Sequence, residues 1–219
     1  MSKDISGPDG VPDGVIDDYD KTNIGSPMPK FTFGWTNTFR YKNFDLSVFI
    51  NGSYGNKVYN YLSMKLTHMN SPWTNQLNAV NGRAQLVPIN PNKVYEDGTM
   101  WYNDVSNVMV ANPGASIPRA TINDPNDNDR ISDRYIEDGS YIRLKNISLG
   151  YTFPKKTIDK LGLSNLRIYA NIQNLLTITG YDGYDPEIGA STSSVNVYGL
   201  DNGRYPSPTV YSFGLNVSF

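Results

Sequence analysis

The apolar residues of this chain recur at every second position in five separate segments. In the last ten residues, VYSFGLNVSF, they share one parity and are Tyr211, Phe213, Leu215, Val217 and Phe219. Ser, Gly and Asn occupy the positions between them. The same alternation runs through residues 31–41, 44–52, 144–153 and 166–174. A period of two predicts β-strands with one apolar and one polar face, so the expected fold class is all-β.

The lengths of the segments and of their connections favour a membrane barrel. A strand of about ten residues, tilted by about 40°, rises close to 25 Å, which is the height of the apolar band of an outer-membrane barrel. Residues 42–43 and 154–165 are short connections, the second with a short helix signal from Pro154 to Gly162, whereas 53–140 and 175–209 are long. Outer-membrane barrels have short periplasmic turns and long outer loops. We therefore expect antiparallel transmembrane strands, although a soluble sandwich would show the same alternation.

These strands divide the chain into alternating wall and loop segments. We expect an extracellular loop at 1–30, a β-hairpin at 31–52, a long extracellular loop at 53–140, a hairpin with a short periplasmic turn at 141–176, an extracellular loop at 177–207 and a final strand at 208–219. Five strands cannot close a barrel, and an open sheet would leave unpaired backbone groups in lipid. The start, MSKDISGPDG, is no secretion signal. Both observations predict a C-terminal piece of a larger barrel.

One strand departs from the pattern. Ile142 and Leu144 have the opposite parity from Ile147 and Leu149, which would place Arg143 on the lipid face together with Lys145. A cation at the bilayer midplane costs about 2–4 kcal/mol. Either a bulge near Lys145 resets the register, or this end of the strand lies beyond the apolar band. The second explanation is the favoured one.

Composition narrows the functional classes. Tyrosine, with 16 copies among 219 residues, suits places where an apolar medium meets water. A net charge of -2 gives no basic field for nucleic acid. The absence of Cys removes disulfides, thiolate metal sites and a Cys nucleophile.

Several segments together resemble a known family. They are DGVIDDYDKTNIGSPMPKFTFGWTNTFRYKNFDLSVFINGSYGN (13–56), SDRYIEDGSYIRLKNISLGYTFP (132–154), LRIYANIQNLLTITGYDGYDPE (166–187) and the closing FGLNVSF. In sequence, order and spacing they resemble the late-barrel region of the SusC/RagA-type TonB-dependent transporters of the Bacteroidota. The resemblance covers most of the chain.

The resemblance implies a 22-stranded barrel in the outer membrane of a Gram-negative bacterium, of which these would be the last five strands. It implies TonB-powered import of oligosaccharides or peptides, with a SusD-like lipoprotein as a lid over the extracellular mouth. TonB would act through an N-terminal part that this sequence does not contain, and the protein would not be an enzyme. The rival interpretation is a soluble extracellular calcium-binding β-sandwich that binds glycans.

The resemblance also gives the closing strand a role. In such proteins the barrel assembly machinery reads a last strand with alternating aromatics, here Tyr211, Phe213, Leu215, Val217 and Phe219. An exposed strand edge can add to another strand, and side chains at alternate positions set the register. The alternative is that these residues only contact outer-membrane lipid.

The segment DGVPDGVIDDYD resembles a calcium loop. Its predicted ligands are Asp9, Asp13, the Val15 carbonyl, Asp17 and Asp20, with Gly14 at the sharp turn. Val11 replaces an oxygen ligand, Asp20 replaces a Glu, and no helices flank the loop. An acidic turn that binds no ion is the alternative.

Other loop residues carry weaker signals. Residues 123–133 are interpreted as a solvated acidic turn, and YDGYDPE (181–187) as a loop packed by its own aromatics. The single His, His68, has no nucleophile motif to work with, so an enzyme is not expected. Trp73, Trp101 and Tyr102 would stack on sugar rings, contact the lid protein or simply pin the longest loop.

Overall fold

The computed structural model of the chain describes residues 3–124, 127–188, 190–191 and 194–219. The chain forms two compact units, which we treat separately. The loop unit comprises Met1–Ile24 and Tyr61–Tyr135, and the sheet unit comprises Gly25–Asn60 and Ile136–Phe219.

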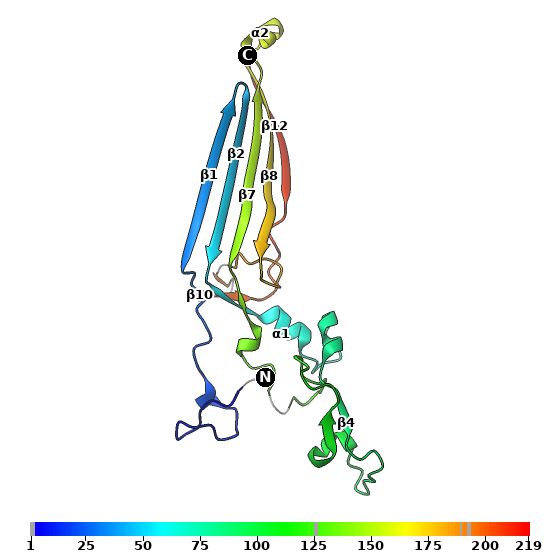
Figure 1. Cartoon of the computed structure of the whole chain (residues 1–219). Coiled ribbons are helices and arrows are strands. Elements are labelled where there is room, and N and C mark those ends of the chain that lie inside the picture. Colours follow the sequence, from blue (N-terminus) through cyan, green and yellow to red (C-terminus); the bar gives the residue numbers. More distant parts are fainter. Residues whose placement is uncertain (1–2, 125–126, 189, 192–193) are drawn as a thin grey trace. The chain divides into compact units, whose positions relative to one another are not determined.

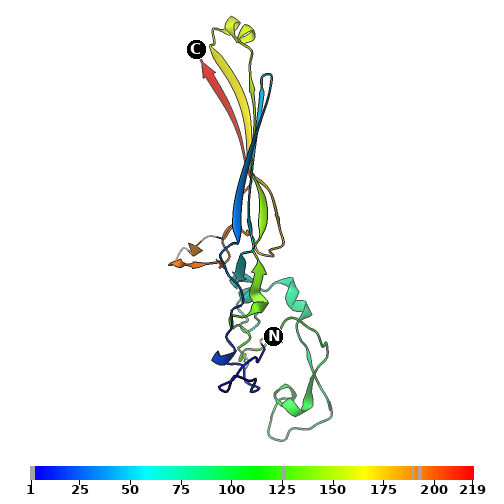
Figure 2. The same ribbon diagram turned by 60° about the vertical axis from the view of Figure 1, so that its left-hand side comes forward.

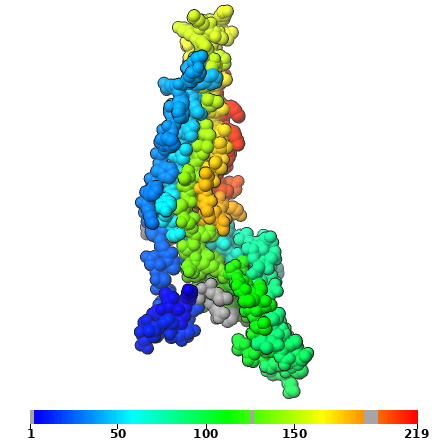
Figure 3. All heavy atoms as spheres, viewed as in Figure 1, coloured from blue at the N-terminus to red at the C-terminus, as the bar shows by residue number. Residues whose placement is uncertain are grey.

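The sheet unit is built on five long strands in one antiparallel sheet. In spatial order they are β1 (Phe31–Tyr41), β2 (Phe44–Tyr54), β7 (Tyr141–Thr152), β8 (Asn165–Thr179) and β12 (Val210–Ser218). They lie side by side from blue β1 at one edge to red β12 at the other (Figure 1, Figure 3). The five predicted strands are therefore confirmed, although β8 and β2 extend further toward the long loops than their alternation indicated.

The register places the apolar residues of all five strands on one face. Val48 pairs with Ile147, Leu149 pairs with Ala170, and Ala170 pairs with Phe213. Because paired residues of neighbouring strands point to the same side of a sheet, the second face collects the Ser, Thr, Asn and Gln positions. We call these the apolar face and the polar face.

The apolar face carries no covering layer in the described part of the sheet unit. Figure 2 shows the long strands closer to edge-on, as one curved layer. Phe213 is 84% exposed, Leu215 61% and Trp35 59%. A β-sandwich would bury these side chains beneath a second sheet, so the sandwich interpretation is not supported.

A β-bulge explains the irregular strand. Along β7, Leu144 pairs with Ile50 of β2 and Asn146 pairs with Phe49, so Lys145 is the extra residue. The bulge restores the parity of the remaining strand and puts Arg143 on the polar face, opposite Thr177. The bulge, which was the less favoured explanation, is confirmed, whereas the favoured one, that this end of the strand lies beyond the apolar band, stays a prediction.

Two short turns join the strands at one end of the sheet, which we call the turn end. Lys42, with φ of 52°, turns β1 into β2. Between β7 and β8 lie α2 (Lys155–Ile158) and a 3-10 turn at Asp159–Leu161, which Gly162 ends in the left-handed region with φ of 71°. This confirms the helix signal, because Gly at that position closes a helix without strain from a Cβ.

Smaller sheets belong to the opposite end of the sheet, the loop end. There β3 (Lys57–Asn60) lies between β11 (Leu200–Asp201) and β6 (Ile136–Asp138). Val58 in β3 is fully buried. A two-stranded sheet adds β9 (Ala190–Ser191) and β10 (Ser194–Tyr198). Strands this short give no periodic signal in a sequence.

The loop unit has little regular structure. It holds α1 (Tyr61–Thr67) and the pair β4 (Leu86–Pro88) and β5 (Val108–Val110). Its 3-10 turns are Asp18–Asp20, Asn78–Gly82, Trp101–Asn103, Val105–Asn107 and Asp133–Tyr135. Met64, Ile117 and Tyr135 are its buried hydrophobic residues among those described. Over the whole described chain, every helix is too short or too polar to cross a membrane.

Candidate functional site

A buried arginine organises the loop end of the polar face. The Arg143 side chain is 3% exposed. Its guanidinium donates to Thr177 Oγ1 at 2.9 Å, to Glu187 Oε2 at 2.7 Å and to the carboxylate of Asp185. A buried guanidinium that lost its partners would destabilise the fold by about 3–5 kcal/mol. The connection between β8 and β12 is therefore held against the wall by its own two carboxylates.

Asp185 ties two distant points of that connection together. Its Oδ1 accepts the Glu187 N–H at 2.9 Å, and its Oδ2 accepts the Ser207 N–H at 2.9 Å. Burial raises the pKa of Asp185, but the hydrogen bonds from Ser207, Arg143 and Glu187 outweigh it and hold the pKa below its ordinary value. The carboxylate is therefore ionised at neutral pH.

A second buried carboxylate shapes the same connection. Asp201 is 1% exposed and accepts the Tyr181 hydroxyl at 2.5 Å. It also accepts the backbone N–H groups of Gly203 at 2.9 Å and Arg204 at 3.3 Å. Burial and the bond to Asp201 raise the pKa of Tyr181, which keeps it a neutral donor. These bonds fix the backbone from which the Arg204 side chain extends.

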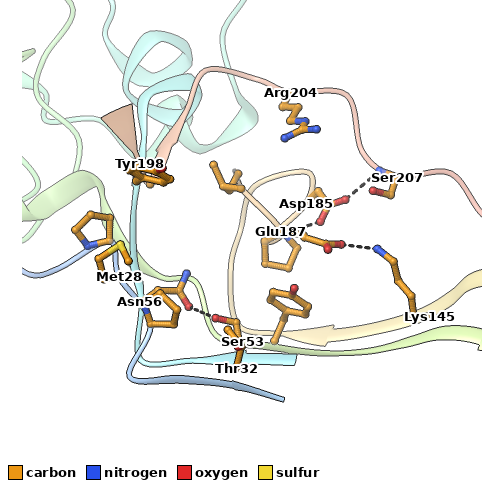
Figure 4. Close-up of a pocket in the computed structure, with 16 residues that line it drawn as sticks. Met28, Thr32, Ser53, Asn56, Lys145, Asp185, Glu187, Tyr198, Arg204 and Ser207 are labelled. Carbon is orange, nitrogen blue, oxygen red and sulfur yellow. Dashed lines mark hydrogen bonds and ion pairs between the residues drawn. The ribbon is translucent and has the colours of Figure 1, made fainter. Parts of the chain in front are cut away.

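Between the wall and this connection lies a cavity of about 630 Å³. Strand residues such as Ser53 and Lys145 line one side (Figure 4). Asp185, Glu187 and Arg204 line the other side, all from the connection between β8 and β12 (Figure 4). The Lys145 ammonium lies 2.8 Å from Glu187 Oε2. The lining combines these charged side chains with apolar ones such as Met28 and Ile188, and the sheet unit supplies all of its lining residues.

Sequence reasoning missed this site. It interpreted YDGYDPE as a loop packed by its own aromatics, and Tyr181 does pack over Gly183, where a Cβ would lie 2.2 Å from the ring. The partner of its carboxylates, Arg143, lies 42 residues away from Asp185. The available signal was the cation at an apparent lipid-facing position, which required either a bulge or a strand end that lies beyond the apolar band.

A second ion pair crosses the polar face nearer the turn end. Arg167 in β8 donates to Asp45 in β2, with Nη2 and Oδ2 2.7 Å apart. The pair spans the intervening strand β7 at Gly150, where a Cβ would lie 2.2 Å from Arg167 Nη2 and 2.6 Å from Asp45 Oδ1. The missing side chain of Gly150 is what lets the two charges meet.

Four of the five predicted assembly residues project from one face of the sheet. Tyr211, Phe213, Leu215 and Val217 lie on the apolar face of β12, and Phe219, 93% exposed, follows the strand. The outer edge of β12 has no strand partner among the described residues. The structure thus presents the alternating side chains and the free backbone edge that strand addition needs.

Three of the predicted calcium ligands, Asp13, Asp17 and Asp20, accept backbone N–H groups. Asp13 accepts the Val15 N–H at 2.9 Å and Asp17 accepts the Tyr19 N–H at 2.8 Å. Asp20 accepts N–H groups from Ile5 at 2.6 Å and Asp17 at 2.9 Å. The described residues hold one group of three imidazole or carboxylate ligands close enough to share an ion, and it lies elsewhere. The calcium site therefore stays a prediction.

That group is His68, Asp124 and Asp129 in the loop unit. His68 Nε2 lies 2.9 Å from Asp124 Oδ2, and Nδ1 lies 3.9 Å from Asp129 Oδ2. The Asp124 side chain is 11% exposed, so the interpretation of residues 123–133 as a solvated turn is wrong for Asp124. Residues 125–126 of that turn lie outside the described residues. Both ring nitrogens face carboxylates, which differs from a nucleophile–base arrangement.

The predicted aromatic residues of the long loop differ in their exposure and in their contacts. Trp73 is 92% exposed. Trp101 and Tyr102 contact each other edge to face, with ring centroids 5.7 Å apart, and Tyr102 is 44% exposed. Their predicted contact with substrate or a lid protein stays a prediction.

Known proteins resemble this chain both in sequence and in fold. No family model matches the chain. TonB-dependent receptor P3 of Formosa agariphila is 36% identical over 211 residues, which cover 94% of this chain and 18% of the receptor. TonB-dependent receptor SusC of Bacteroides thetaiotaomicron is 29% identical, covering 94% of this chain and 17% of SusC.

Among solved structures, the RagAB peptide importer in its closed-closed state aligns with a TM-score of 0.66 and 19% identity. The alignment covers 97% of this chain and 20% of that one. The chain thus spans about a fifth of the length of the proteins it matches. It belongs to the SusC/RagA type of TonB-dependent receptors and corresponds to a segment of such a protein.

Proposed function

We propose that this chain forms five neighbouring wall strands of an outer-membrane β-barrel that imports nutrients with energy from TonB. The observation that carries the proposal is the single-layered antiparallel sheet with an uncovered apolar face. Apolar area in water costs about 25 cal/mol per Å². Hydrocarbon tails remove that cost, whereas water would favour collapse or aggregation.

The remainder of the receptor closes the barrel. The outer edges of β1 and β12 have no strand partners among the described residues, and lipid does not tolerate unpaired backbone groups. We propose a barrel of 22 strands in total, of which these are the last five. The polar face then lines the lumen, and the loops at the loop end lie outside the cell. The organisms of the relatives support the outer membrane of a Gram-negative, Bacteroidota-like bacterium.

The cargo we propose is an oligosaccharide or a peptide. A related solved structure is described as a peptide importer, and SusC is a TonB-dependent receptor. The chain's role is to form the wall and the vestibule, and no reaction on the cargo is part of it. A SusD-like lipoprotein would cover the outer mouth, with the exposed Trp73 and Tyr102 as contacts to it or to cargo.

Four further interactions complete the proposal. TonB would act through the part of the receptor that precedes this segment. The barrel assembly machinery would bind β12 along its free edge, with the side chains from Tyr211 to Phe219 setting the register. After assembly the same side chains would contact outer-membrane lipid. A Ca²⁺ ion in the N-terminal acidic loop would stiffen that loop.

Lipid-attached nitroxides test the wall assignment. The chain has no Cys, so single cysteines can be placed in the complete receptor, freed of any other cysteines, and labelled with a small fluorophore. We expect nitroxide lipids to quench the label at Leu149→Cys and Phe213→Cys and to spare it at the neighbouring polar-face positions, Ser148→Cys and Ser212→Cys. Similar quenching at both parities would refute the proposal.

A further inference from the structure

We propose that the cavity at the loop end of the polar face is a carboxylate-binding subsite of the importer, with Arg204 as the residue that recognises the carboxylate. The inference rests on the proposed function, because it assigns a chemical group to the imported cargo.

The carboxylates of the cavity are already matched. Asp185 is paired with Arg143, and Glu187 accepts from both Arg143 and Lys145 at 2.7 and 2.8 Å. Arg143 lies buried behind the lining, and the second cation that lines the cavity besides Lys145 is Arg204, which makes no ion pair and no side-chain hydrogen bond with the described residues. Counting buried Arg143 together with the two lining cations, three positive charges stand against two carboxylates, which leaves one positive charge unmatched.

The fold holds Arg204 in place without using its charge. Its backbone N–H is bonded to buried Asp201, which is held in turn by the Tyr181 hydroxyl. Three residues along, Ser207 is bonded to Asp185. Both ends of this short segment are thus anchored, while the guanidinium remains exposed at the rim of the cavity (Figure 4). A donor group on an anchored backbone loses less conformational entropy when it binds a ligand.

The chemistry of the donor favours a carboxylate. A guanidinium presents two parallel N–H groups that match the two oxygens of a carboxylate. One surplus positive charge balances a monoanion, whereas a phosphate monoester carries close to two negative charges at neutral pH. Tyr141 and Tyr198 also line the cavity, and their rings can cover the apolar part of a ligand beside its charged group.

The test measures charge preference in the complete, detergent-purified receptor. One probe pair is an N-acetylated neutral tetrapeptide with a free C-terminal carboxylate and its C-terminal amide. The other is an oligosaccharide that ends in glucuronic acid and its glucose counterpart. We expect the wild-type receptor to bind the acidic member of one pair roughly 10- to 100-fold more tightly. The pair that responds identifies the source of the carboxylate.

Substitutions then assign the preference to Arg204. Arg204→Gln should bring the acidic-to-neutral ratio close to one, while Arg204→Lys should keep part of it. Lys156→Gln is the matched control, because it removes the same charge from an exposed residue in the turn between β7 and β8, and it should leave the ratio unchanged. Heat-dependent gel mobility verifies that each variant is folded. The inference would be overturned if the wild-type receptor showed no preference for the acidic member of either pair. It would also be overturned if the preference for the acidic member survived in Arg204→Gln.

Uptake by cells separates this inference from the proposed function. Wild-type receptor should support uptake that is lost when TonB is removed. TonB-independent uptake would contradict the proposed function. TonB-dependent uptake together with an unchanged charge ratio in Arg204→Gln would contradict only the carboxylate subsite.

Discussion

Two glycines show how closely side chains pack on each face of the sheet. At Gly52, on the apolar face, a Cβ would lie 2.5 Å from the Phe33 ring and 2.5 Å from the Tyr141 backbone oxygen. At Gly150, on the polar face, it would meet the far end of Arg167. Backbone cannot move aside as a flexible side chain can, so the two positions should differ in tolerance.

We therefore expect Gly52→Ala to destabilise the assembled receptor by about 1–3 kcal/mol, as overpacking does. Gly150→Ala should cost less than about 1 kcal/mol, because it displaces a partly exposed ion pair, Arg167–Asp45. Gly180→Ala, with nothing within 4 Å of its Cβ, is the control. Thermal unfolding in detergent measures all three. Equal losses at Gly52 and Gly150 would contradict the packing argument.

At the scale of the element, the connection between β8 and β12 behaves as a docked loop rather than a free one. Asp185 holds Arg143, Glu187 and Ser207 at once. The depressed pKa of Asp185 means that its contribution to docking is complete above the unfolded-state pKa near 3.9. The contribution is lost as the pH falls from that value through the lower folded-state pKa.

Hydrogen exchange at the Glu187 and Ser207 amides measures this docking. After correction for intrinsic rates, protection should drop several-fold between pH 6 and pH 3, because at pH 3, about one unit below the unfolded-state pKa, a single carboxylate can lose at most about ninefold of stabilisation. Asp185→Asn should lower the protection at pH 6 and flatten the pH dependence. Protection that is equal at both pH values, or unchanged in Asp185→Asn, would show that Asp185 does not hold the loop.

The bulge in β7 is a second feature at the scale of the element. Alternation located the strand, but the residues before Lys145 had the wrong parity for a continuous strand. Only pairing with β2 and β8 decides where an extra residue sits, because the bulge is a property of two strands and not of one. Arg143 then reaches carboxylates that follow β8 in sequence.

At the scale of the whole molecule, the uncovered apolar face should govern solubility. We expect the isolated 219-residue chain to aggregate in plain buffer and to disperse in detergent, because Phe213, Leu215 and Trp35 are exposed and large apolar patches associate in water. Sedimentation velocity with and without detergent measures this. A monodisperse monomer in plain buffer would contradict the wall assignment and revive a soluble module.

The sequence alone determined the strands, their parity, the contrast between short turns and long loops, and the resemblance to SusC/RagA-type receptors. Those properties are local, since a period of two, a Gly after a helix turn and a family motif are written in consecutive residues. Tertiary structure decided the bulge at Lys145, the burial of Asp124 against His68, and the cavity lined by Lys145, Asp185 and Arg204. These features join residues tens of positions apart. Their energy comes from burying charges against specific partners, and no local pattern records which partner that is.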